Sequence, residues 1–179
     1  MVRVFATLFC MICAFSAYAA PQEKWRTFEI TPRISVEMPE MTIEQTHWRP
    51  AVLDGITYGQ QHVVEYLQQN DTYLIYVETT VIPRVIYYTR SPGSHLQRAA
   101  KKVIEQMDVQ WKKKRMITLA TTHMITASSI ELPHAAHVQA VIDVRERRII
   151  TMFYDGVYNP KISERFLKSL VIRPVTPSH

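Results

Sequence analysis

The stretch Ala136–Tyr154, AHVQAVIDVRERRIITMFY, decides the fold class of this chain. Two apolar runs rich in β-branched residues, Ala136–Val144 and Arg148–Tyr154, flank the polar segment Arg145-Glu146-Arg147. Runs of this composition are typical of strands. A connection of three residues permits antiparallel pairing, whereas a parallel crossover needs a dozen or more residues. The stretch therefore predicts a β-hairpin within an antiparallel sheet.

Other segments carry the same strand signals. Ile34–Met38 alternates apolar and polar residues before Pro39, and Pro50 with Asp54-Gly55 marks a break farther on. Tyr87-Tyr88 falls in an expected connection. The remaining strands are expected at Thr42–Trp48, Ile56–Leu67, Tyr73–Ile82, Met116–Ala120 and His123–Leu132, with Gln68–Asp71 as a turn.

Two helices are expected. Ser94–Asp108 begins with Ser94 and Gln97 in capping-box spacing, and its apolar residues share one face while His95 lies on the opposite, polar face. Asn159-Pro160 provides an N-cap and a first-turn proline for a short helix over Lys161–Leu170. Strands in series, interrupted by one long helix, predict an α+β fold with an antiparallel sheet of about six strands and helices packed on its faces.

The N-terminus has the order of a secretory signal peptide. Arg3 precedes an almost purely apolar run, and Ala17-x-Ala19 is the cleavage signature, so residues 1–19 are expected to be removed. Both cysteines of the chain, Cys10 and Cys13, would leave with this segment, so their C-x-x-C spacing carries no chemistry in the mature protein. The apolar run is too short for a bilayer helix. We expect a periplasmic or secreted protein with no transmembrane helix after cleavage.

The mature chain is expected to be one domain, of the commonest size. We place a flexible leader at 20–27, the domain at 28–172 and a disordered tail at 173–179. Cleavage removes one of 21 basic residues and none of 16 acidic ones, which leaves a charge of about +4. This mild excess favours an anionic partner.

Three segments carry a family resemblance. Ile34-Ser35-Val36-Glu37-Met38-Pro39 resembles the opening F-S-V-x-F/M-P of small secreted bacterial proteins related to the PsbP fold, which a Ran-GTPase-binding nuclear protein also shares. Val138–Tyr154 resembles their final hairpin, and Ser163–Leu170 resembles their closing A-x-x-F-x-x-S-F helix. The resemblance implies an antiparallel α+β sandwich of PsbP-like type and, for the plant members, an accessory role in a photosynthetic membrane complex. Glu40 stands where family members often carry glycine, and no ligand-site residues match.

The most uneven charge lies on and after the long helix. This basic set could form a patch for anionic lipid headgroups, a lipopolysaccharide phosphate or an acidic protein partner. The alternative is a solvated helix exit whose charges protect a strand from edge pairing. Nucleic acid is not expected as a partner, because an exported protein seldom meets it. The basic set consists of Arg98, Lys101, Lys102, Trp111, Lys112, Lys113, Lys114 and Arg115.

A metal site is the first alternative. His134 and His137 could both face one copper or zinc ion if they formed a helical turn, with His123 as a third ligand. We expect loop histidines after Pro133 instead, because side chains three apart on extended chain point to opposite faces.

Catalytic motifs are missing from the sequence. There is no G-x-S-x-G, no H-E-x-x-H, no phosphate-binding glycine loop and no cysteine in the mature chain. We therefore expect a non-catalytic, cofactor-free binding or accessory protein of the bacterial envelope, one that assists a membrane protein complex through its basic surface. A hydrolase with an unrecognised site is the second alternative.

Overall fold

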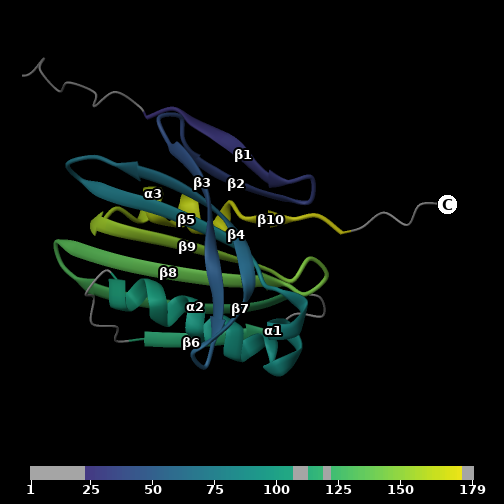
Figure 1. The fold of residues 1–179 in the computed structure, drawn as a ribbon. Helices are drawn as coiled ribbons and strands as arrows, with labels where there is room; N and C mark the ends of the chain where they lie inside the picture. Colours follow the sequence, from purple (N-terminus) through teal and green to yellow (C-terminus); the bar gives the residue numbers. More distant parts are fainter. Residues whose placement is uncertain (1–22, 107–112, 119–121, 175–179) are drawn as a thin grey trace, which may run out of the picture.

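A computed structural model describes residues 23–106, 113–118 and 122–174 (Figure 1). The strands in these ranges are β1 (Trp25–Thr31), β2 (Ile34–Pro39), β3 (Ile43–Leu53), β4 (Ile56–Gln69), β5 (Tyr73–Val81), β6 (Lys113–Thr118), β7 (Thr122–Glu131), β8 (His134–Asp143), β9 (Arg148–Val157) and β10 (Val171–Ile172). The helices are α1 (Arg84–Thr89), α2 (Pro92–Gln106) and α3 (Pro160–Lys168).

The described strands form two antiparallel sheets. A seven-stranded sheet has the order β3-β4-β5-β9-β8-β7-β6, and a three-stranded sheet has the order β1-β2-β10. The expected hairpin of β8 and β9 is confirmed, with a continuous register from His134↔Val157 to Asp143↔Arg148. The α+β class with an antiparallel sheet is therefore confirmed.

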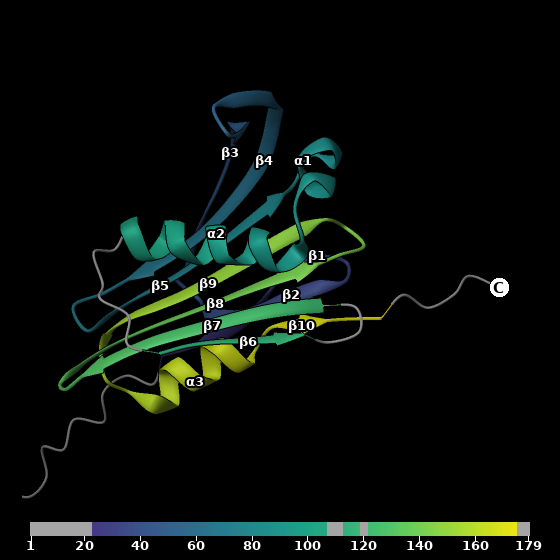
Figure 2. The same cartoon turned by 90° about the horizontal axis from the view of Figure 1, so that it is seen from below.

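The helices cover opposite faces of the large sheet. α2 lies on one face, where Leu96, Ala100 and Val103 are buried against strands β7 to β9 (Figure 2). α3 and the three-stranded sheet cover the other face, with Phe166 fully buried among side chains of β2, β5 and β9. Side chains of the central strands β5 and β9 alternate between the two cores, as the pleat requires.

The helix boundaries differ from the expected ones at the N-terminal end. α2 begins at Pro92, and Ser91 is the residue before it: the Ser91 side-chain oxygen accepts from the Ser94 amide at 3.3 Å. A proline at the first helical position preceded by serine explains this earlier start. Tyr87 and Tyr88, expected in a connection, form part of α1. α3 begins after Asn159 as expected, and the Asn159 Oδ1 accepts from the Ile162 amide.

Both boundaries of the expected domain extend. Trp25, placed in the leader, begins β1 because residues Trp25 to Thr27 pair with Pro39 to Glu37 of β2. Arg173, placed in the tail, donates its amide to the Arg33 carbonyl at 2.8 Å. Main-chain pairing with β2 therefore orders residues at both ends of the chain.

The β3–β4 hairpin extends beyond the sheet. β3 continues through Pro50 to Leu53 across a bulge, which an edge strand tolerates. Asp54 and Gly55 form its turn with φ of 50° and 81°, as a two-residue hairpin loop requires. β4 pairs with β5 only from Val63 onward. The distal half of the hairpin therefore leaves the sheet and rises on the same side as α2 (Figure 2).

Candidate functional site

A cleft of about 270 Å³ lies between α2, strand β5 and the β3–β4 hairpin. α2 packs on β7, β8 and β9, so it leaves the same face of β4 and β5 open beside it. Seven polar or charged residues line the cleft from four elements: Arg49, Gln61, Glu78, Thr80, His95, Arg98 and Lys102. The buried apolar residues Ile82, just after β5, Ile86 of α1 and Ile149 of β9 also line it. The volume equals that of about nine water molecules, which is enough for a small charged group.

Glu78 is the polar centre of the cleft and is only 7% exposed. Arg49 donates to both of its carboxylate oxygens, at 3.1 and 2.5 Å. Lys102 Nζ donates to Oε2 at 2.8 Å, and the Thr80 hydroxyl donates to Oε1 at 3.1 Å. The Glu78 carboxylate therefore bonds to two cations, Arg49 and Lys102, that are far from it in the sequence.

These contacts set the charge of Glu78. Burial alone would raise the pKa of its carboxyl, but the hydrogen bonds and charges of Arg49 and Lys102 outweigh burial and lower the pKa to about 2. Glu78 is therefore ionised at neutral pH. A carboxylate so fully engaged is a poor proton donor or acceptor near pH 7.

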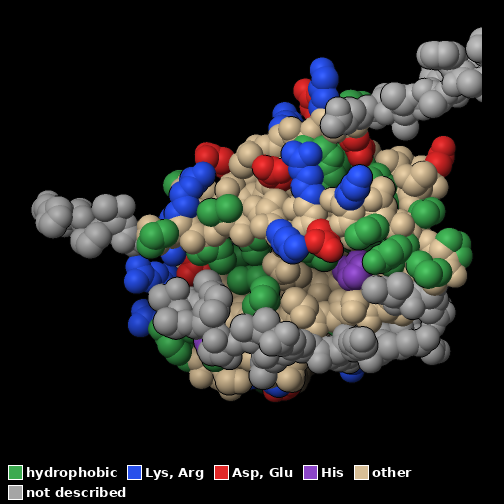
Figure 3. Space-filling view, turned by 180° about the vertical axis from the view of Figure 1, so that it is seen from behind, with side chains coloured by type: hydrophobic (Ala, Val, Ile, Leu, Met, Phe, Trp, Pro, Cys, Tyr) green, Lys and Arg blue, Asp and Glu red, His purple; other side chains and the backbone are tan. Residues whose placement is uncertain are grey.

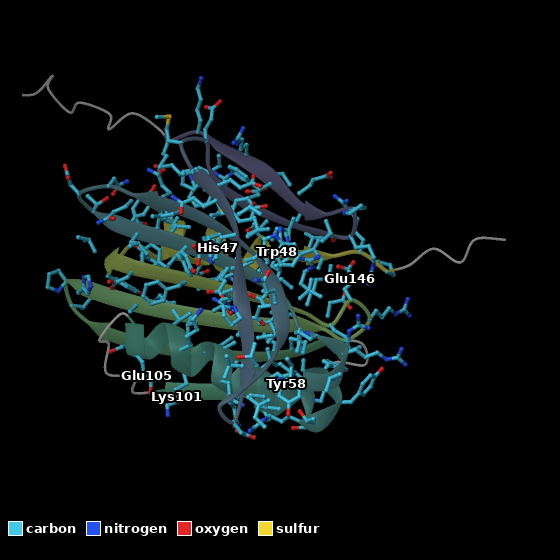
Figure 4. The ribbon with its side chains drawn as sticks, in the orientation of Figure 1. His47, Trp48, Tyr58, Lys101, Glu105 and Glu146 are labelled. Carbon is cyan, nitrogen blue, oxygen red and sulfur yellow. The ribbon has the colours of Figure 1, made fainter. Side chains whose placement is uncertain are left out.

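A hydrogen-bond chain extends the cluster toward the hairpin. The Tyr76 hydroxyl lies 2.8 Å from Glu65 Oε1 and 3.2 Å from Glu78 Oε2. Burial, together with these two carboxylates, raises the pKa of Tyr76, so its hydroxyl keeps its proton. His47 Nδ1 lies 3.9 Å from the other oxygen of Glu65, and Figure 4 shows His47 on β3. Glu78 is therefore bonded both to neighbouring strand residues and to Lys102 of α2.

His95 lies in the wall of the cleft. The sequence analysis had placed it on the polar face of α2, and that prediction is wrong. It is 6% exposed, and its ring stacks on Tyr87 with Nε2 3.1 Å from the Tyr87 carbonyl oxygen. Burial lowers the pKa of His95, and the neighbouring Arg90 and Arg98 lower it further against the effect of that hydrogen bond. His95 is therefore neutral at pH 7 and donates from Nε2.

The cleft carries an excess of positive charge. Among the described residues that line it, Arg49, Arg98 and Lys102 stand against the single carboxylate of Glu78. Arg49 and Lys102 already bond to Glu78, whereas Arg98 has no ion-pair or hydrogen-bond partner in the described part of the chain. A guanidinium in this state, beside a second arginine and an ammonium, attracts a carboxylate or a phosphate group.

The structure brings only part of the predicted basic set together. Arg98 and Lys102 line the cleft, while Lys101 points away from it and pairs with Glu105 at 3.3 Å on the exposed side of α2 (Figure 4). Lys113, Lys114 and Arg115 lie in β6, at the opposite edge of the sheet from β3. Trp111 and Lys112 lie outside the described residues.

The three candidate metal ligands are far apart. His134 and His137, expected in a loop, both belong to β8, because they pair with β7 and β9 on either side. Their offset of three places them on opposite faces of the sheet. His123 pairs with Ile142, eight positions along the β8 ladder from His134, or about 26 Å at the rise of a strand. Within the ranges that the structure describes, no group of three or more ligand residues lies close enough to hold a metal ion.

His134 has a different contact. Its Nε2 lies 2.7 Å from Asp155 Oδ1, in an ion-pair geometry that is not a hydrogen bond. His137 lies against the ring of Tyr154 on the other face, where burial lowers the pKa of its imidazole. Each histidine therefore has a packing or pairing role at its own place on β8.

Sequence reasoning missed the two residues that organise the cleft, Arg49 and Glu78. Glu78 had a readable signal, because it interrupts the apolar run Tyr73–Ile82 on the same side of the strand as Tyr76 and Thr80. A carboxylate within a central strand requires a partner. Arg49 had no such signal, because nothing local relates it to β5.

Charges of both signs lie on the other side of the molecule. On the rear face, basic and acidic side chains stand next to one another (Figure 3). On α3, Lys168 pairs with Glu164 and Arg165 pairs with Glu37 of β2. The cleft beside α2 is therefore the best candidate for an anion site in the described part of the chain.

No protein-family model, curated protein or solved structure matches this chain. None of the helices in the described ranges has the length and apolar character that crossing a membrane requires.

Proposed function

We propose that this chain is an exported, non-catalytic binding protein of the bacterial envelope, and that its cleft receives an anionic group of its partner. The observation that supports this proposal is the guanidinium of Arg98, which bonds to no described residue and lies beside Arg49, Lys102 and one fully hydrogen-bonded carboxylate. Because Arg49 and Lys102 are fixed by Glu78, they present their remaining N–H donors in a set geometry. An incoming carboxylate or phosphate would then find these two cations held in position beside the Arg98 guanidinium.

Binding fits these side chains better than acid–base catalysis does. Glu78 stays ionised at neutral pH, Tyr76 stays protonated, and His95 is neutral and uses its Nε2–H on a backbone carbonyl. Each of these groups has a fixed protonation state near pH 7. A general acid or base would need a pKa near the working pH.

The proposal keeps the PsbP-like sandwich as its structural frame. The order of five strands, two helices, four strands and a closing helix supports that resemblance, as does the location of the closing helix beside β2. An accessory role beside a membrane complex is part of the same proposal, and in-cell crosslinking followed by mass spectrometry would identify the partner.

The direct test is a titration of the purified protein with inorganic phosphate and with succinate, followed by calorimetry and amide chemical shifts. We expect saturable binding of at least one anion, with shifts at α2 and β5, weakened by 0.5 M sodium chloride. Arg98→Gln should weaken binding about tenfold, the worth of one charge-assisted hydrogen bond.

The matched control is Arg26→Gln. Arg26 lies on β1 on the other side of the large sheet, with its guanidinium over the Phe28 ring. Its substitution should leave anion binding unchanged. If no anion saturates the protein, or if both variants bind as the unchanged protein does, the cleft does not bind an anionic group.

A further inference from the structure

Exposed apolar side chains gather at one end of the molecule, on the hairpin tip and α1. Val52 and Ile56 flank the turn of the β3–β4 hairpin and are 52% and 58% exposed. Val85 and Tyr88 lie on α1 and are 60% and 70% exposed. We call these four residues the apolar rim. Figures 1 and 2 both show the hairpin tip and α1 side by side at this end, and in Figure 2 both project beyond the sheet on the side of α2.

The apolar rim is held in place. Arg90, just after α1, donates to both carboxylate oxygens of Asp54 in the hairpin turn, at 2.7 and 3.0 Å. Below the surface, Leu53 of the hairpin and Ile86 of α1 belong to the same buried cluster. The two projections are therefore joined by one ion pair and one apolar contact region, so that the exposed residues are presented together.

The surroundings of the rim are positively charged. Of the five basic residues between Thr79 and Ile104, Arg84 and Arg98 have no carboxylate partner in the described part of the chain, whereas Arg90, Lys101 and Lys102 are paired. Arg84 lies over the Tyr88 ring, with 5.9 Å between the guanidinium carbon and the ring centroid. The one carboxylate of the hairpin turn, Asp54, is already paired with Arg90. An occupant of this surface must therefore offer apolar groups together with negative charge.

We propose that the apolar rim docks on the surface of an anionic lipid bilayer. Valine, isoleucine and tyrosine side chains on short projections fit the boundary between headgroups and acyl chains, and the surrounding arginines fit lipid phosphates. Four side chains are too few for deep insertion, so the contact is peripheral and reversible. It would set the cleft, which opens on the same side of the sheet, next to the membrane. The inference stands on the rim and does not require the anion site of the cleft.

The experiment is flotation of the purified protein with two kinds of vesicle. One contains phosphatidylglycerol and phosphatidylethanolamine, and the other contains phosphatidylcholine alone. We expect binding to the anionic vesicles and at least a tenfold weaker binding to phosphatidylcholine. Val85→Ser with Tyr88→Ser should lower the partition coefficient about tenfold, and Arg84→Gln should lower it about fivefold.

The matched control is Val157→Ser with Tyr158→Ser. This pair has the same residue types, and its members are 50% and 41% exposed. It lies at the C-terminal end of β9, whereas α1 lies near the turn before the other end of β9. The control should bind vesicles as the unchanged protein does, and thermal unfolding followed by circular dichroism should show all variants folded. Equal binding to both vesicles, no binding to anionic vesicles, or equal losses in rim and control variants would each overturn the proposal. Phosphate titration of Arg98→Gln tests the cleft, and vesicle flotation tests the apolar rim. The two proposals can therefore fail independently.

Discussion

Replacing Glu78 by glutamine tests the electrostatics of the cleft. The pKa of its carboxyl is about 2 in the folded chain against an ordinary value of 4.5, so folding favours the ionised form. A difference of about 2.5 pKa units corresponds to about 3 kcal/mol of stability at pH 7. Glu78 is nearly buried, so solvent screening removes little of this. We expect the free energy of unfolding to fall by about 3 kcal/mol in Glu78→Gln, because the Arg49 and Lys102 charges then lack their counterion.

The pH dependence separates charge from shape. Since the folded pKa is depressed, the stabilisation is complete above pH 5 and is lost as the pH falls toward 2. The difference between the unchanged protein and Glu78→Gln should therefore shrink to about 1 kcal/mol at pH 3. Urea unfolding followed by circular dichroism at pH 7, 5 and 3 measures it. A difference that stays constant over this range, or that is below about 1 kcal/mol at pH 7, would refute the electrostatic account.

Glu105→Gln is the control for this measurement. Glu105 forms the exposed pair with Lys101 on the same helix, with both side chains more than 60% exposed. Exposed pairs of this kind contribute about 0.5 kcal/mol or less. Its substitution should leave the urea midpoint nearly unchanged at every pH. A loss comparable to that of Glu78→Gln would mean that α2 responds to any change of charge.

Three further predictions concern the fold and its processing. Gly156→Ala should lower the free energy of unfolding in urea by about 3 kcal/mol, because the new Cβ would lie 2.4 Å from the Thr72 carbonyl oxygen. Gly59→Ala, in open space at φ 89°, should lower it by only about 1 kcal/mol. Similar losses for the two variants would contradict the steric argument. Asn159→Ala should cost about 1 kcal/mol by removing the cap of α3, and no change in the urea midpoint would count against it. Intact mass of the exported protein should fit a chain beginning at Ala20, and a mass that includes both cysteines would exclude cleavage after Ala19.

The strands and hairpins were predictable because their signals are local. Alternation identified β2, short polar turns identified the β4–β5 and β8–β9 hairpins, and Asn159-Pro160 identified the start of α3. The errors have causes outside the local sequence. β8 begins at His134 because both neighbouring strands pair with it, and that pairing is not written in its own residues. His95 was misplaced because its burial depends on Tyr87 of α1, a helix that the sequence pattern did not indicate.

The candidate site was predictable only in part, because its members meet through the tertiary fold. Helical periodicity placed Arg98 and Lys102 on α2, but their different states follow from what lies opposite. Lys102 faces a carboxylate on β5, whereas no described side chain bonds to Arg98. Charge counting therefore overestimated the basic face, since Lys101 and Lys102 are both paired. It also missed Arg49, which reaches the cleft because the β3–β4 hairpin leaves the sheet.

The buried charges of the cleft are an inefficient way to stabilise this fold. Removing two cations and a carboxylate from water costs several kcal/mol per ion, and apolar side chains of similar volume often serve a protein equally well or better. The chain fills the rest of this sheet face with apolar residues from β7, β8, β9 and α2. Beside β5 it keeps charges and open volume instead, and it leaves one guanidinium at the border without a described partner. From this contrast we infer that the polar half of the face is maintained for binding, since the packing of the other half shows that the same sheet supports an apolar core.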